Sequence, residues 1–172
     1  MEHAIDRERR RVLRLGAVLA VAVTSSACGF KLRGNAQMPF ASVYVDVAGY
    51  SQLGFEIKRS LRLTNARLVD SPAAAQATLH IMSEIREKQI LSLGGQGRVR
   101  EYQLRYRVGY RLTDGKTATF IEPSEILLKR DISFNDSEIL AKEAEEALLY
   151  RDMQTDAVQQ LVRRLQVAKL AT

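Results

Sequence analysis

The stretch EYQLRYRVGYRLTDG, residues 101–115, alternates apolar and polar side chains more regularly than any other part of the chain. One set of alternate positions is Tyr102, Leu104, Tyr106, Val108, Tyr110 and Leu112. The other set is Glu101, Gln103, Arg105, Arg107, Gly109 and Arg111, of which three are arginine. This period of two predicts a β-strand with one face on a core and the other toward water or a partner.

Asp114-Gly115 closes this strand and is a strong signal for a hairpin turn. We therefore expect a partner strand within residues 117–134. Pro123 should interrupt it, because proline is tolerated only at a sheet edge or a bulge. Beyond it, Asn135 and Glu138 have the spacing of a capping box. They predict a long last helix over residues 137–170, with a one-sided apolar stripe that runs from Leu140 to Leu165.

Upstream of the alternating stretch, residues 42–47 are β-branched and alternate, which predicts a strand. Residues 51–64 have helical spacing of leucine and isoleucine, with Ser51 as the N-cap. A connection over 65–75 and a second strand over 77–88 follow. Residues 88–100 contain several glycines and are typical of a mobile loop.

The expected order is strand, helix, three strands, helix. It predicts an α+β fold in which two helices pack on one face of a roughly four-stranded, mostly antiparallel sheet, a two-layer sandwich. The other face of the sheet would then be free for binding.

The N-terminus has the layout of a bacterial export signal. Five arginines precede the uncharged run LGAVLAVAV, residues 15–23, and small residues lead to Cys28, the only cysteine. Small residues directly before a cysteine resemble a lipobox, in which the chain is cut before a cysteine that is then acylated. We expect a signal peptide over 1–27, a lipidated tether over 28–41 and one domain over 42–172. Cleavage by an ordinary secretory route is the alternative.

The amino-acid composition limits the classes of function that this chain can have. The chain is 46% hydrophobic and 27% charged, as folded soluble domains are. Beyond the leader the chain has one histidine, His80, and one cysteine, Cys28, which cannot build a zinc site or a Cys-His dyad. We therefore expect no metal, no cofactor and no enzyme. The net charge of +6 is modest, and an exported protein does not meet nucleic acid, so we expect no nucleic-acid partner.

Basic residues are the candidate binding groups. Arg105, Arg107 and Arg111 share one face of the alternating strand, and Arg98 and Arg100 lead into it. Lys142 opens the last helix. Arginine and lysine bind phosphates through charge-assisted hydrogen bonds, but a solvated or carboxylate-paired face is the alternative for each.

Four motifs, in this order across the mature chain, resemble the LptE family of LPS-assembly lipoproteins: CGFKLRG (28–34), REYQL (100–104), LAK (140–142) and QQLVRRL (159–165). The resemblance implies two helices on a four-stranded sheet and a non-enzymatic outer-membrane lipoprotein. Members of the family plug the β-barrel of LptD in a 1:1 complex, bind lipopolysaccharide and assist its insertion into the outer leaflet.

The resemblance also implies lipidation of Cys28 and two basic positions for lipopolysaccharide. One falls on Lys142. The other falls before Glu101, where an ungapped count reaches Gly95, so that Arg98 or Arg100 would take its place. Arg105, Arg107 and Arg111 would contact either the barrel or lipid. The alternative function is another lipid-binding periplasmic lipoprotein, such as a transport-system accessory subunit.

Overall fold

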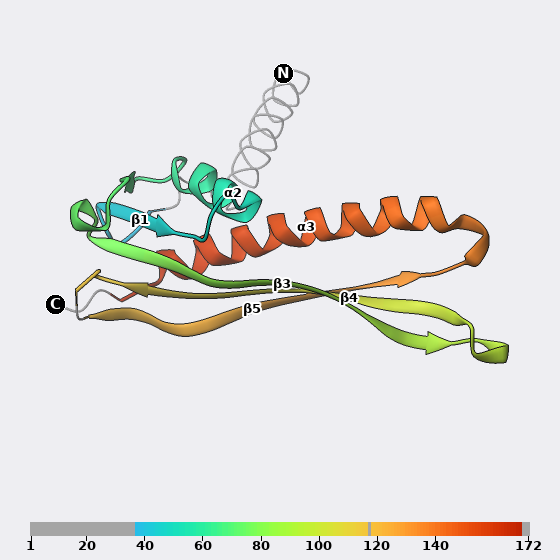
Figure 1. The fold of residues 1–172 in the computed structure, drawn as a ribbon. Helices are drawn as coiled ribbons and strands as arrows, with labels where there is room; N and C mark the ends of the chain where they lie inside the picture. Colours follow the sequence, from blue (N-terminus) through green and yellow to red (C-terminus); the bar gives the residue numbers. More distant parts are fainter. Residues whose placement is uncertain (1–36, 117, 170–172) are drawn as a thin grey trace, which may run out of the picture. The chain divides into compact units, whose positions relative to one another are not determined.

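The computed structural model describes residues 37–116 and 118–169. The predicted signal peptide, Cys28 and most of the predicted tether therefore lie outside the described residues. The elements follow the order β1 (Ser42–Asp46), α2 (Gln52–Leu61), β2 (Arg67–Leu68), β3 (Ala77–Leu93), β4 (Val99–Thr113), β5 (Thr119–Ser133) and α3 (Ile139–Gln166). Short 3₁₀ turns, η2 (Pro72–Ala74), η3 (Gly95–Gly97) and η4 (Asp136–Glu138), lie between them (Figure 1).

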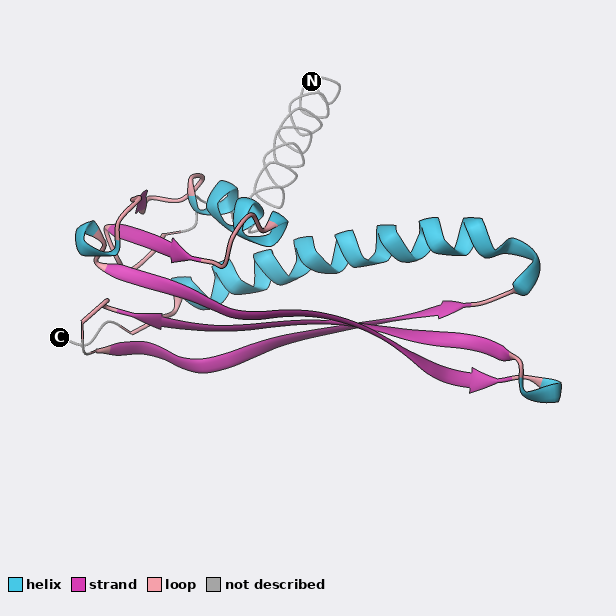
Figure 2. Ribbon diagram, viewed as in Figure 1, coloured by secondary structure: helices cyan, strands magenta, loops and turns pink. Residues whose placement is uncertain are grey.

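The five strands form one mixed sheet in the order β2-β1-β3-β4-β5. β3, β4 and β5 pair antiparallel, whereas β1 pairs parallel with both β2 and β3. Both helices lie on one side of this sheet (Figure 2), and α3 packs on β4 and β5. The predicted α+β class and two-layer arrangement are confirmed. The additional strand is β2, a two-residue strand in the segment that the sequence predicts as a connection.

β4 has the two faces that its alternation predicts. Leu104, Tyr106, Val108, Tyr110 and Leu112 are all buried under the helices. The hairpin after it forms as expected, with Gly115 at a φ of 77°, a region that favours glycine. The pairing of β4 with β5 shifts register between Tyr110 and Leu112 of β4, opposite Glu122 and Pro123 of β5. This irregularity confirms the predicted interruption, and β5 is an edge strand of the sheet.

The expected loop over residues 88–100 is wrong at both ends, because β3 takes its first residues and β4 begins at Val99. β3 continues to Leu93, and only residues 94–98 form the turn to β4. The pairing of β3 with β4 shifts between Ile81 and Ser83 and again between Ile90 and Ser92. Each irregularity reverses which alternate residues face the helices, so no single period of two runs along β3 and the sequence pattern is lost.

The first helix follows the sequence closely. Ser51 is the N-cap, and its Oγ accepts a hydrogen bond from the backbone N–H of Gly54. Leu53, Ile57 and Leu61 are buried at the expected helical spacing. A Cβ on Gly54 would lie 2.7 Å from Val47 Cγ1, so the glycine allows α2 to approach the end of β1 closely.

The predicted apolar stripe of the last helix is buried only in its C-terminal half. Met153, Ala157, Val158, Leu161 and Leu165 lie in the core. Towards the helix N-terminus, Leu140 is 82% exposed and Leu148 is 54% exposed. Asn135 caps the 3₁₀ turn η4 instead of the α-helix itself, since its side chain accepts from the N–H of Ser137. α3 therefore extends past the core along β3, β4 and β5.

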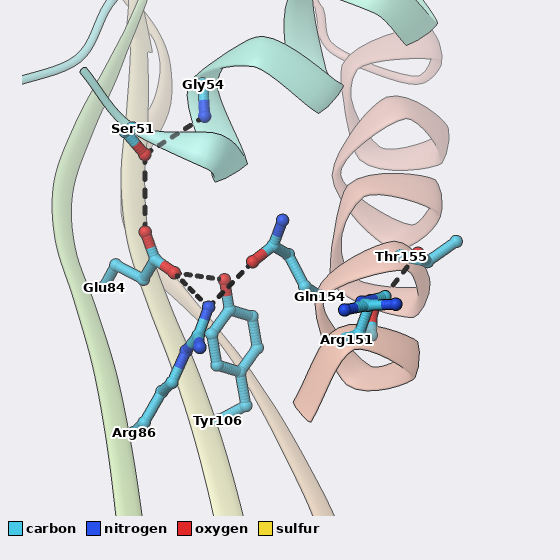
Figure 3. Close-up of polar contacts among 8 residues, drawn as sticks. All are labelled: Ser51, Gly54, Glu84, Arg86, Tyr106, Arg151, Gln154 and Thr155. Atoms are coloured by element: carbon cyan, nitrogen blue, oxygen red, sulfur yellow. Dashed lines mark hydrogen bonds and ion pairs between the residues drawn. The ribbon is translucent and has the colours of Figure 1, made fainter. Parts of the chain in front are cut away.

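A polar network joins both helices to the sheet (Figure 3). The Glu84 carboxylate accepts hydrogen bonds from the Tyr106 hydroxyl at 2.8 Å and from Ser51 Oγ at 3.4 Å. The Arg86 guanidinium donates to Gln154 Oε1 of α3 at 2.9 Å and lies 5.6 Å from the centre of the Tyr106 ring. The network fixes how α2 and α3 sit on β3 and β4.

Burial, with the Glu84 hydrogen bond as the next cause, raises the pKa of Tyr106 above its ordinary value. The fold therefore favours the neutral phenol. This contribution to stability is fully present below the unfolded pKa of about 10 and is lost as the pH rises above it. Tyr106→Phe should lower the free energy of unfolding by about 1 kcal/mol at pH 7. The deficit should shrink by about 1.4 kcal/mol per pH unit above pH 10.

Urea unfolding of both proteins across this range measures the difference. Tyr50→Phe is the matched control, since the Tyr50 side chain is fully exposed. Stability curves of wild type and Tyr106→Phe that stay parallel through pH 11 would show that the phenol does not titrate with unfolding.

Among the described residues, no helix is both long and apolar enough to cross a membrane.

Candidate functional site

Lys142 lies in the first turn of α3, where the helix begins beyond the core. Its Nζ donates to Ser133 Oγ at 3.2 Å and lies 2.9 Å from Glu145 Oε2. Only 16% of its side chain is exposed, because it lies against the end of β5. The ammonium group is thus held in place at this end of the sheet and is not a freely solvated charge.

Arg100 lies near the same place. With Ser133 and Phe134 it lines a hollow of about 500 Å³, and its carbonyl accepts the N–H of Phe134. Ser133 therefore lines the same hollow as Arg100 and accepts a hydrogen bond from Lys142. Arg98 lies in the turn between β3 and β4, its side chain is exposed, and it does not line this hollow. Of the two candidates within residues 88–100, Arg100 is the one that lines a hollow together with Ser133, the hydrogen-bond partner of Lys142.

Lys88 of β3 completes the group, and the sequence did not single it out. Its Nζ lies 4.3 Å from the centre of the Tyr102 ring and 5.8 Å from that of Phe134. The two rings meet edge to face with centroids 5.3 Å apart. We call these five residues, Lys88, Arg100, Tyr102, Phe134 and Lys142, the distal cluster.

A small hollow of about 160 Å³ opens between α3 and the sheet at the distal cluster, lined by Lys88, Tyr102, Phe134, Lys142 and Glu146, among others. A larger one of about 550 Å³ adjoins it under α3 and shares Lys88 and Glu146. We call these two hollows, which share Lys88 and Glu146, the recess of the distal cluster. Cations, carboxylates and aromatic rings line it, and the exposed apolar residues Ile139 and Leu140 lie at its edge.

Both lysines of the cluster are paired with carboxylates. Lys88 Nζ lies 2.6 Å from Glu146 Oε2, and Lys142 pairs with Glu145. Such partly exposed ion pairs contribute about 1 kcal/mol or less each. A phosphate carries more charge and more acceptor oxygens than a carboxylate, so it can replace a glutamate at these ammonium groups at little cost. The recess is suited to an anionic amphiphile: phosphate on the lysines and apolar chains on the neighbouring residues.

The arginines of the alternating strand form a different surface. Arg105, Arg107 and Arg111 are on the face of β4 that is turned away from the helices, opposite the buried tyrosines. Arg107 pairs with Glu87 of β3, and Arg105 Nε donates to Gln103 Oε1 at 2.9 Å. The structure therefore separates the six predicted basic residues into the distal end and this open face.

The missed residue could have been found from its spacing. Lys88 faces Leu104 in the β3–β4 pairing, and Leu104 is an inward residue of the alternating strand. Because Lys88 is opposite Leu104, it shares the helix-facing side of the sheet with Tyr102, whose own partner is Ile90. The glycines of the expected loop concealed this continuation.

The chain is similar to known proteins in sequence and in fold. The sequence profile of the family described as "LptE: Lipopolysaccharide-assembly" matches residues 40–165. The LPS-assembly lipoprotein LptE of Yersinia enterocolitica is 35% identical over 168 residues, 95% of this chain and 79% of the relative. That of Photorhabdus laumondii is 30% identical over 162 residues, 91% of this chain and 86% of the relative.

Solved structures with a similar fold include the following two. The solution structure of an uncharacterized lipoprotein B from Nitrosomonas europaea is 44% identical with a TM-score of 0.70, and covers 80% of this chain and 90% of its own. The crystal structure of rare lipoprotein B from Shewanella oneidensis is 26% identical with a TM-score of 0.64, and covers 72% of this chain and 92% of its own.

Proposed function

Since the chain belongs to the LptE family of lipopolysaccharide-assembly proteins, we propose that it is an outer-membrane lipoprotein that plugs and helps to assemble an LptD-like β-barrel in a 1:1 complex. In that complex it binds lipopolysaccharide during insertion into the outer leaflet. Its role is non-enzymatic, and its anchor is acylated Cys28. Two or more acyl chains suffice for stable anchoring in a membrane.

The observation that carries the lipopolysaccharide role is that Lys88 and Lys142 line one recess, with Arg100 in a neighbouring hollow that shares Phe134 with it. Lipid A presents phosphates on an amphiphile with acyl chains. The distal cluster offers ammonium and guanidinium groups for the phosphates, and exposed Leu140 and Ile139 for apolar contact. Arg98, at the adjacent turn, is close enough along the chain to join a larger headgroup.

The barrel role is supported by what the distal half leaves exposed. We define the distal half as residues 84–107 and 127–149. Eight of the thirteen large hydrophobic side chains that are exposed among the described residues lie in it. They are Ile85, Ile90, Leu91, Leu93, Leu127, Ile139, Leu140 and Leu148. Such a concentration marks a surface that a partner covers.

The open face of the sheet fits the inside of a barrel. Barrel interiors are polar, and this face carries Arg105 and Arg107 together with Glu87 and Asp131. Half-exposed Ile85 and Leu127 lie among them. We therefore place this face against the inner wall and the recess of the distal cluster toward the lipopolysaccharide.

Affinity purification from detergent-solubilised membranes tests the barrel role. The tagged full-length chain should bring down one large β-barrel protein in equal amount. A photo-crosslinking residue at Leu127 should attach to that barrel, because Leu127 lies on the open face. Leu63 is the matched control, since it is equally apolar and 73% exposed but lies outside the distal half. Recovery of inner-membrane transport components without a barrel would instead favour an accessory lipoprotein of another system.

A further inference from the structure

A second recess lies at the other end of the sheet, beside the β4–β5 hairpin. It has a volume of about 350 Å³ and is lined by Thr78, His80, Arg111, Thr113 and Lys116, among others. Thr113 pairs with Thr78 of β3 and with Thr119 of β5, at the opposite end of β4 from the distal cluster. The recess is therefore separate from the proposed lipopolysaccharide site.

The recess contains a buried hydroxyl without a partner. Thr78 is 2% exposed, and its Oγ1 makes no hydrogen bond to any described residue. A buried polar atom normally finds a partner, and one that does not is destabilising. Thr78 is at the recess wall, so a bound acceptor would satisfy its hydroxyl.

The charged side chains that line the recess are basic. Arg111 and Lys116 approach no carboxylate within salt-bridge distance among the described residues, unlike Arg107 on the same strand, which is paired with Glu87. The nearby Asp114 carboxylate is already occupied, since its Oδ1 accepts the backbone N–H of Lys116 and of Ala118. Asp114 keeps its charge, but neither it nor Asp46 lines the recess, so the charged groups that face a ligand there are the two cations.

His80 holds the walls of the recess in position. Its Nδ1 lies 2.8 Å from Asp46 Oδ2, and its Nε2 lies 3.1 Å from Thr113 Oγ1. A carboxylate only accepts, so Nδ1 carries the hydrogen, and in the neutral imidazole Nε2 accepts from the Thr113 hydroxyl. The Thr113 oxygen in turn accepts the N–H of Gly115 at 3.3 Å. This chain of bonds ties β1, β3, β4 and the hairpin, and makes His80 a positioning residue.

We propose that this recess binds a phosphate-type oxyanion. Thr78 Oγ1 donates a hydrogen bond to it, and Arg111 and Lys116 supply the charge. Arginine binds phosphate with two parallel N–H groups, and a hydroxyl beside it completes a common phosphate-binding set. The volume exceeds that of a phosphate ion, which leaves space for a group esterified to it.

The source of the phosphate is either a membrane headgroup or a free phosphate. Pro72 lines the recess and begins the turn η2. The carbonyl of Ala74 in this turn accepts a hydrogen bond from Ser42 Oγ, which lies near the start of the described chain. Eight residues lie between Cys28 and Gln37, so the two ends of this segment are at most about 30 Å apart when it is extended. A headgroup source therefore rests on the proposed anchor, whereas phosphate binding itself does not depend on the proposed function.

The test uses the full chain with Cys28→Ser, which cannot be acylated. Inorganic phosphate should shift the backbone amide resonances of Thr78 and Gly115 saturably. Thr78→Val and Arg111→Gln should each weaken this binding about tenfold or more, as expected when a hydrogen bond to a charged group is lost. Arg105→Gln, on the same face of the same strand, should leave it unchanged.

Thr78→Val also separates binding from folding. Valine has the shape of threonine and removes a hydroxyl that has no partner, so the melting temperature without phosphate should stay the same or rise. A fall in melting temperature would show that Thr78 Oγ1 already has a structural partner, and would overturn its role as the free donor.

A second arm identifies the source. Co-sedimentation of the Cys28→Ser chain with phosphatidylglycerol vesicles, lost in Arg111→Gln and absent with phosphatidylcholine vesicles, would identify a headgroup. Phosphate binding without vesicle binding would identify a free phosphate. No response to either probe would overturn the inference, even if the barrel co-purifies. Phosphate binding that persists when no barrel co-purifies would instead count against the proposed function alone.

Discussion

Leu161→Ala should lower the free energy of unfolding by about 3 kcal/mol and the melting temperature by about 10 °C. Leu161 is 1% exposed and belongs to the core where α3 packs on the sheet. Truncation removes buried methyl groups and leaves a cavity that the strands cannot fill. Leu148→Ala, in the same helix and the same predicted stripe, should change stability by less than about 0.5 kcal/mol.

Urea unfolding of the two variants measures this contrast. Leu148 is the matched control, because the residue type, the helix and the truncation are the same and only burial differs: its side chain is 54% exposed. Equal losses of stability in the two variants would mean that the N-terminal half of α3 packs on the sheet in solution. The same pair should behave differently in the barrel complex, where Leu148 would be covered.

Lys142→Asp should weaken lipopolysaccharide binding about tenfold or more. The change removes a cation that would bond a phosphate and puts an anion in its place, and a hydrogen bond to a charged group contributes about 1.5–3 kcal/mol. The fold should be unaffected. The lost Lys142–Glu145 pair is a weak one, and an aspartate in the first turn of a helix is favoured by the helix dipole.

Arg163→Asp is the control, because it makes the same charge change on an exposed residue at the other end of α3. Binding to immobilised lipopolysaccharide and a thermal melt are measured on both variants. Unchanged affinity in Lys142→Asp would remove Lys142 from the proposed site. Equal losses in both variants would show that binding follows net charge and not the geometry of the distal cluster.

The elements that the sequence predicts well are those whose information is local. The N-cap at Ser51, the alternation of β4, the Asp114-Gly115 turn and the interruption at Pro123 each depend on a few neighbouring residues. All four are present in the structure. The sequence also indicated Arg100 and Lys142 as binding residues, and the structure places both beside Ser133.

The elements that it missed depend on pairing with distant residues. The two-residue strand β2 exists only because Ser42 and Val43 of β1 lie beside it. β3 runs past residue 88 because β4 offers it a partner, although the bulge at Ile90 to Ser92 breaks its alternation. That pairing places Lys88 of β3 near the residues of β4 that follow the turn at 94–98, and so in the distal cluster.

The sequence by itself determined the fold class, the face of β4 that is buried and the family, since periodicity, turn chemistry and motifs are written in consecutive residues. Only the tertiary structure decided which apolar residues are buried. The stripe on α3 is continuous in sequence, but the sheet and α2 cover only its C-terminal half. A hydrophobic pattern states that a surface needs covering, and only packing shows whether the chain covers it or leaves it to a partner.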